Sequence, residues 1–353
     1  MRHPLFEGIR IFLTTTVQIA TRQQQQDMAA PQPDWPGTQR ARPPSGGWRV
    51  REEAIMGTAI RVELWSDEPS RGEEAIDAVM AEMHRIDRSM SPHKEDSELS
   101  CVNRDAATRA VKLSAEMLHL VARAVHFSEL SGGAFDITYA SVGHLYDYRR
   151  RVHPTDAEIA RAREAVGWRH LILDRSSGTI RFARAGVRID LGGFAKGHAV
   201  DNSIAILQRL GFRSAYVAAG GDSRVLGDRH DRPWTVAIRD PRRADSVVAL
   251  LPLQDVAIST SGDYERFFEE GGVRYHHVID PHTGRSPCGV RSVTILADDG
   301  LTSEALSKTV FVLGVERGME LIETLSGVDA VVVDADGVLH FSSGLLAGTP
   351  ALQ

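Results

Sequence analysis

The stretch Arg188-Ile-Asp-Leu-Gly-Gly-Phe-Ala-Lys-Gly-His198 carries an expected strand directly into two glycines and the start of a helix. Unpaired backbone N–H groups at a helix start favour an anion. Gly192 and Gly193 would let that backbone approach a ligand closely. Lys196 lies in the first turn, where a cation is unfavourable unless it faces an anion. A diphosphate-type ligand accounts for both features, and a tight turn with a solvated lysine explains this motif equally well.

Outward from this turn, helical and strand patterns mix without regular βαβ alternation or an internal repeat. We expect a strand at 187–191 and a helix at 195–210 around the glycines. Apolar spacing predicts further helices at 73–90, 114–130, 156–166, 303–313 and 316–325. Strand candidates include 59–64, 171–173, 179–182, 214–219, 234–239, 247–251, 257–259, 275–279, 292–297, 330–333 and 338–341. This pattern favours an α+β fold with mixed, largely antiparallel sheets and packed helices.

Composition excludes several classes of protein. The 353 residues are 42% hydrophobic and 25% charged, which is typical of a globular chain rather than of a collagen, a coiled coil or a disordered protein. There is no apolar run of about 18 residues, so we expect no transmembrane segment. The net charge of −6 offers no general field for nucleic acid. The two cysteines, Cys101 and Cys288, are too few for a zinc cluster.

Residues 1–50 differ from the rest of the chain. Gln23–Gln26 is a polar tract, and several prolines follow it among Gly and Arg. Such a composition buries too little apolar surface to order itself, so we expect a disordered leader or linker, with a weak targeting segment as the alternative. The leader has no cysteine for lipidation, and both the bacterial cytoplasm and export to the periplasm stay open. We expect one folded domain at 51–345 and a tail at 346–353.

Other candidate positions are weak when each is taken alone. Gly132 to Asp136 and Ala219 to Asp222 are glycine turns that carry a carboxylate. His276 and His277 should point to opposite faces of a strand, so only one of them can serve a site as a general base. Glu304 and Lys308 share a helix face, where an ordinary ion pair is the simplest interpretation.

Taken together, these pieces resemble the flavin transferases, also called FAD:protein FMN transferases (the ApbE family). The matching pieces run in the family's order from about residue 56 to about 341. They are Met56-Gly-Thr58; residues 90–100 with Asn103; Gly133-Ala-Phe-Asp136; Asp190 to Gly197; Gly220-Gly-Asp222; Ser259 to Tyr264; His277-Val-Ile-Asp-Pro281 with Thr283-Gly284; and Ser303 to Gly314. The resemblance implies the ApbE-like two-lobed architecture.

The resemblance also implies an activity and a set of site residues. Family members cleave FAD and transfer FMN to a Thr or Ser hydroxyl of an acceptor protein, with release of AMP, and some members hydrolyse FAD to FMN and AMP. By resemblance, His277 deprotonates the acceptor hydroxyl. The expected FAD-binding residues are Met56, His93, Ala134, Phe135, Asp136, Asp190, Lys196 and Ile279. His93 departs from the family, which commonly has a Tyr or Trp there.

The largest departure lies at the expected Mg²⁺ site. The resemblance implies one Mg²⁺ held by the carbonyl of Gly193 and by side chains at 304 and 308, where the family has Asp and Thr. Lysine supplies no oxygen ligand and repels a metal. Lys308 could swing away and leave Glu304 and Ser307 to bind Mg²⁺, or its ammonium could replace the metal charge, or the site could bind FAD without turnover. We favour the second outcome.

The sequence therefore predicts a flavin transferase that acts on FAD and on a protein Thr or Ser. A non-catalytic FAD-binding protein and an FAD pyrophosphatase are the alternatives.

Overall fold

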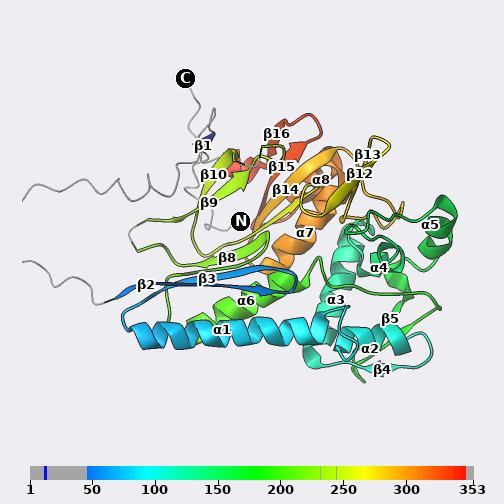
Figure 1. Ribbon diagram of the computed structural model, residues 1–353, viewed down its shortest axis with the longest axis horizontal. Coiled ribbons are helices and arrows are strands. Elements are labelled where there is room, and N and C mark those ends of the chain that lie inside the picture. The colour runs from blue at the N-terminus through cyan, green and yellow to red at the C-terminus, as the bar shows by residue number, and fades with distance from the viewer. Residues whose placement is uncertain (1–11, 14–45, 231, 244, 347–353) are drawn as a thin grey trace, which may run out of the picture.

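The computed structural model describes residues 12–13, 46–230, 232–243 and 245–346, and its centre is an eight-stranded sheet (Figure 1). The strand order is β16-β15-β14-β11-β8-β7-β3-β2, and each neighbouring pair is antiparallel. The strands are β2 (Gly47–Ile55), β3 (Thr58–Ser66), β7 (Ala215–Ala219), β8 (Asp222–Leu226), β11 (Ala257–Gly262), β14 (Val290–Ala297), β15 (Val328–Asp334) and β16 (Leu339–Phe341). The predicted α+β fold with antiparallel sheets is confirmed.

One face of this sheet is covered by long helices. They are α1 (Pro69–Met90), α6 (Ala195–Arg209), α7 (Gly300–Leu313) and α8 (Val315–Glu323). In β14, Val293 and Ile295 are buried in the core on the helix side, whereas Leu296 belongs to the cluster on the opposite face. The alternation follows from the period of two in a strand.

The opposite face packs against a small second sheet of β9 (Trp234–Arg239) and β10 (Val247–Leu253), with β1 (Phe12–Leu13) paired to β10. Leu251 of β10 and Ile258 of β11 share this second apolar cluster. The short helix α9 (Ser343–Leu346) ends the described chain, and its Leu345 joins the same cluster. The sheet therefore lies between a helical layer and a β layer.

The second lobe lies to the right in Figure 1 and is built mostly from residues 98–182. Its elements are α2 (Glu98–Asp105), β4 (Val111–Lys112), α3 (Ala115–Leu130), η2 (Ile137–Tyr139), α4 (Ala140–Gly143), α5 (Asp156–Arg163), η3 (Trp168–His170), β5 (Leu171–Asp174) and β6 (Thr179–Phe182). Thr155 caps α5 in a reciprocal capping box with Glu158. A separate hairpin of β12 (Phe267–Glu270) and β13 (Val273–His276) lies near α4 and α5.

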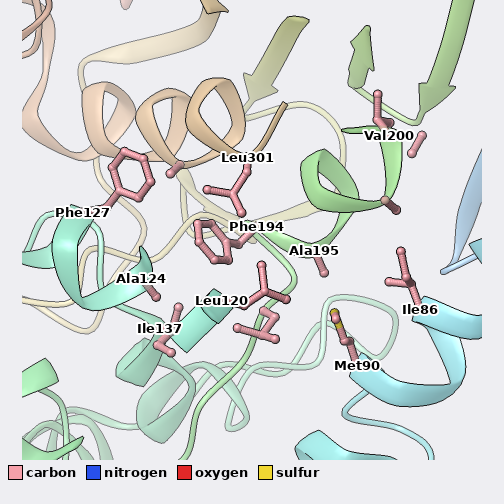
Figure 2. Close-up of a cluster of buried hydrophobic side chains, with 14 of the residues drawn as sticks. Ile86, Met90, Leu120, Ala124, Phe127, Ile137, Phe194, Ala195, Val200 and Leu301 are labelled. Atoms are coloured by element: carbon pink, nitrogen blue, oxygen red, sulfur yellow. The ribbon is translucent and has the colours of Figure 1, made fainter. Parts of the chain in front are cut away.

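Phe194, the residue before α6, joins the two lobes. Its side chain is fully buried, and its ring centroid lies 5.6 Å from that of Phe135 and 6.2 Å from that of Phe127. Figure 2 shows Phe194 between α3, which carries Leu120 and Phe127, and Leu301 at the start of α7. Burying one such side chain contributes about 1.5–3 kcal/mol. The packing fixes the glycine turn between the lobes.

Three sequence expectations differ from the structure. Residues 187–191 do not form a strand, because their backbone bonds to Asn103, Ser141 and Ile137 instead of to a neighbouring strand. The strand expected at 275–279 ends at His276. Strand β2 begins at Gly47, four residues before the domain start expected at residue 51, and Phe12–Leu13 pairs with β10.

The rest of the expected leader and residues 347–353 of the tail lie outside the described residues. Strands β2 and β8 and helix α2 have no counterpart among the sequence predictions. Within the described part of the chain, none of the helices has the length and apolar character that a membrane span requires.

Candidate active site

The glycine turn before α6 is held by side chains from distant elements. Asn103 of α2 donates to the carbonyl of Ile189 at 2.9 Å and accepts from its N–H at 2.7 Å. The carboxylate of Asp190 accepts from the N–H of Gly192, and the Asp190 N–H donates to the Ile137 carbonyl. Burial raises the pKa of Asp190. The turn therefore has a fixed shape before any ligand arrives.

Helices α6 and α7 cross at two glycines. A Cβ on Gly197 would lie 2.1 Å from the carbonyl oxygen of Gly300, and a Cβ on Gly300 would lie 2.7 Å from that of Gly197. Only glycine permits this approach, because real Cβ atoms do not come within such distances. The crossing brings Glu304 of α7 to the start of α6, where its carboxylate accepts from the Gly197 N–H at 2.8 Å.

Lys196 meets two buried carboxylates. Its ammonium pairs with Glu304 and lies 2.7 Å from Asp222, the first residue of β8. Burial opposes the charge on Lys196, but Asp222 and Glu304 outweigh it and raise its pKa. Burial and the neighbouring Asp222 raise the pKa of Glu304. The anion that the first turn of α6 requires is thus supplied in this structure by the protein itself.

Lys308 lies on the other side of the same turn. Its Nζ donates to the hydroxyl of Ser261 at 2.7 Å. A Cβ on Gly193 would lie 3.4 Å from Cγ of Lys308 and 3.7 Å from its Cε, so the lysine stem covers the glycine turn. Burial and the charge of Lys196 lower the pKa of Lys308. The intrahelical ion pair expected between Glu304 and Lys308 is replaced by the longer-range pair of Glu304 with Lys196.

The two adjacent histidines have different surroundings. His276 is 2% exposed, packs edge-on against Phe311 and bonds the Pro287 carbonyl through Nε2. His277 lies among cations: burial and then the charge of Lys308 lower its pKa to about 3. Its Nδ1 is buried without a hydrogen-bond partner among the described residues. The low pKa keeps the His277 imidazole neutral at pH 7.

Two of the expected flavin-binding residues lie at the edges of this cluster. Met56, half-buried with φ of 53°, begins the turn between β2 and β3. The exposed Arg266 donates to the Gly57 carbonyl at 3.3 Å. His93 is exposed, and its charge would act on Asp190. Met56 is thus next to the residue that Arg266 contacts, and His93 is close enough to act on Asp190 in the glycine turn.

The other expected flavin-binding side chains are buried. Ala134 and Phe135 are 2% and 5% exposed. Asp136 accepts from Thr138 and, at 2.7 Å, from the Trp168 N–H, so its carboxylate ties the 132–136 turn to η3. Ile279 packs in a small cluster with Tyr146 and Ile159. Burial and these contacts hold the four side chains in place.

Two surface hollows of about 360 and 580 Å³ lie on the second lobe. The larger one touches Gly132 and Trp168, next to the 132–136 turn. Neither of these hollows is lined by Lys196, Lys308 or His277.

Residues 56–332 match the sequence model of the ApbE family. The chain belongs to the ApbE family. It is 33% identical to the FAD:protein FMN transferase of Treponema pallidum (strain Nichols), over 85% of this chain and 90% of that protein. It is 35% identical to the FAD:protein FMN transferase of Vibrio cholerae, over 74% and 80%. The crystal structure of the ApbE protein from Thermotoga maritima matches with a TM-score of 0.79 at 32% identity, over 85% of this chain and 99% of that one.

The Mg²⁺ ion that the ApbE family implies does not fit the donors of this chain. The two oxygens of Glu304 are bonded to Lys196 and to the Gly197 N–H. Ser307 is fully buried, and its hydroxyl bonds Ser259, Ser261 and the Glu304 carbonyl. An ammonium stands where an oxygen ligand is needed.

Sequence reasoning missed the roles of several residues in this ApbE site. Asp222 looks like a local turn residue, yet it pairs with Lys196. Tyr139 and Arg266 both interact electrostatically with Asp190. Asn103 stands in a matching motif, but nothing in the sequence indicates its bonds to Ile189. In the sequence, Asp222 and Asn103 are indicated only by the family motifs in which they stand.

Proposed function

We propose that this chain transfers FMN from FAD to the hydroxyl of a Thr or Ser in an acceptor protein and releases AMP. One observation carries the proposal: the glycine turn, the cations Lys196 and Lys308 and the neutral His277 converge on one place. The relatives from Treponema pallidum and Vibrio cholerae are named FAD:protein FMN transferase, which supports the same activity.

In this proposal, FAD lies with its diphosphate beside the glycine turn. Met56, His93, Asp190 and Lys196 contact it, while the turn of Ala134, Phe135 and Asp136 and the buried Ile279 shape the pocket. Support comes from the burial of Ala134, Phe135, Asp136 and Ile279. It also comes from His93 and Lys196, whose charges act on Asp190 beside Gly192. Attack on a diphosphate requires positioning and neutralisation of charge more than covalent help from the protein.

His277 acts as the general base. It takes the proton of the acceptor hydroxyl, the oxygen bonds to the FMN-side phosphorus, and the bond from that phosphorus to the bridging oxygen breaks, so AMP leaves. The imidazole is held neutral by burial and nearby cations, and the two negative charges of a bound diphosphate would stabilise the imidazolium that forms. No step is assigned to Mg²⁺, because the donors present do not suit it.

The test separates three functions. FAD is mixed with a candidate acceptor protein and with the same acceptor whose Thr or Ser is replaced by Ala, and the proteins are weighed by mass spectrometry. The transferase adds one FMN to the first acceptor alone.

His277→Asn should lower the transfer rate about 10²–10⁴-fold and keep FAD binding, while His84→Asn, at an exposed site on α1, should change neither. Free FMN and AMP without acceptor would indicate a pyrophosphatase, and unchanged FAD would indicate a carrier.

A further inference from the structure

We propose that the ammonium group of Lys308 takes the place of a divalent cation at the FAD diphosphate, so that this chain binds and cleaves FAD without a metal. The inference rests on the proposed function, because it concerns the same site.

The first support is the position of Lys308. Its stem lies against Gly193, the residue whose carbonyl the family resemblance assigns to the metal. Its Nζ is fixed by Ser261 of β11 at 2.7 Å. The side chain is only partly buried, so its charge can be reached from the turn. The lysine side chain therefore lies against the glycine turn to which the resemblance assigns the metal.

The second support is the charge balance of the cluster. Lys196 and Lys308 carry two positive charges, and Asp222 and Glu304 carry two negative ones. The two carboxylates pair directly with Lys196, whereas Lys308 donates a hydrogen bond to the neutral hydroxyl of Ser261. Among the described residues, Lys308 is the cation of this cluster without a direct ion pair. Its charge is available to an incoming anion.

The third support is the state of the other oxygen donors. Both oxygens of Glu304 and the hydroxyl of Ser307 are already bonded within the protein.

Binding of Mn²⁺, measured by electron paramagnetic resonance, tests the inference independently of turnover. We expect no stoichiometric Mn²⁺ on the wild-type protein, with or without FAD. Lys308→Thr removes the ammonium and adds a hydroxyl, and it should bind one Mn²⁺ at least about 100-fold more tightly than wild type. Lys112→Thr, an exposed lysine of β4, should behave as wild type. One Mn²⁺ bound by wild type, or none bound by folded Lys308→Thr, overturns the proposal.

A second measurement needs no variant. Wild-type protein treated with EDTA should keep its affinity for FAD and its rate of FMN transfer within about twofold. Loss of both in EDTA, with recovery on adding Mg²⁺, would overturn the inference. Absence of transfer under every condition would instead contradict the proposed function, and the Mn²⁺ measurement would still decide the role of Lys308.

Discussion

The carboxylate of Glu304 on α7 accepts a hydrogen bond from the backbone N–H of Gly197 on α6, at 2.8 Å, although 107 residues separate them. This bond satisfies one of the N–H groups at the start of α6 and brings Glu304 to Lys196. The start of α6, Lys196 and Glu304 are therefore linked by direct contacts. A change in any one of them should alter the position or the charge state of the other two.

Removing the charge of Lys196 should destabilise the fold in a pH-dependent way. Lys196→Met leaves Asp222 and Glu304, which are 3% and 0% exposed, without their ammonium partner. Breaking a buried ion pair costs about 3–5 kcal/mol of unfolding free energy at pH 7. The loss should shrink toward pH 5, because the stranded carboxylates can then protonate.

Urea unfolding at both pH values measures this effect, and Lys112→Met at an exposed site is the matched control. An equal loss at pH 7 and pH 5 would contradict the assignment of the lost stability to charge.

The crossing of α6 and α7 should not tolerate a methyl group. Gly197→Ala would place a Cβ 2.1 Å from the Gly300 carbonyl oxygen, so the helices must separate. We expect a loss of stability of about 1–3 kcal/mol from overpacking and weaker FAD binding, since Lys196 and Glu304 move apart. Gly47→Ala, where nothing lies within 4 Å of the added Cβ, should leave both quantities unchanged. Thermal unfolding and FAD titration compare the two variants.

His277 should make the protein less stable in acid. Its folded pKa of about 3 lies below the ordinary value of 6.5, so the unfolded chain binds more protons between these pH values. The contribution of His277 to stability is therefore complete above pH 6.5 and is lost as the pH falls toward 3, by a few kcal/mol. His277→Gln should flatten the dependence of unfolding free energy on pH in this window. An unchanged slope would show that His277 is not held neutral.

Asn103 should act on FAD through the glycine turn. Asn103→Ala leaves the N–H and carbonyl of Ile189 without their partner, which costs about 1–3 kcal/mol. Because Ile189 precedes Asp190 and the glycines, we expect weaker FAD binding together with the loss of stability. Asn202→Ala removes a bond to Glu82 on α1 and should leave the affinity for FAD unchanged. Equal affinity for FAD in both variants would contradict a positioning role for Asn103.

Sequence reasoning succeeds here where local rules decide the structure. The helices predicted at 195–210 and 156–166 are observed at 195–209 and 156–163, because apolar spacing within a few residues decides them. The extended run 187–191 reads as a strand because its apolar pattern is local, whereas its hydrogen-bond partner Asn103 lies 86 residues away.

The contacts of the site residues also involve partners that are distant in the sequence. The spacing of Glu304 and Lys308 predicts a shared helix face, but the partners of both side chains come from other elements. Asp222 joins Lys196 because β7 and β8 pair beneath α6, and such tertiary contacts have no local signature. Positions within one turn are predictable, while partners across the fold are not.

The most direct measurement uses FAD labelled with ³²P either at the FMN phosphate or at the adenylate phosphate. Each form is incubated with the purified chain and with protein extract from the cell that encodes it. The account predicts that label from the FMN phosphate becomes covalently attached to an acceptor protein, while label from the adenylate phosphate appears as AMP. Consumption of FAD that leaves both labels in small molecules, or no consumption at all, would contradict it.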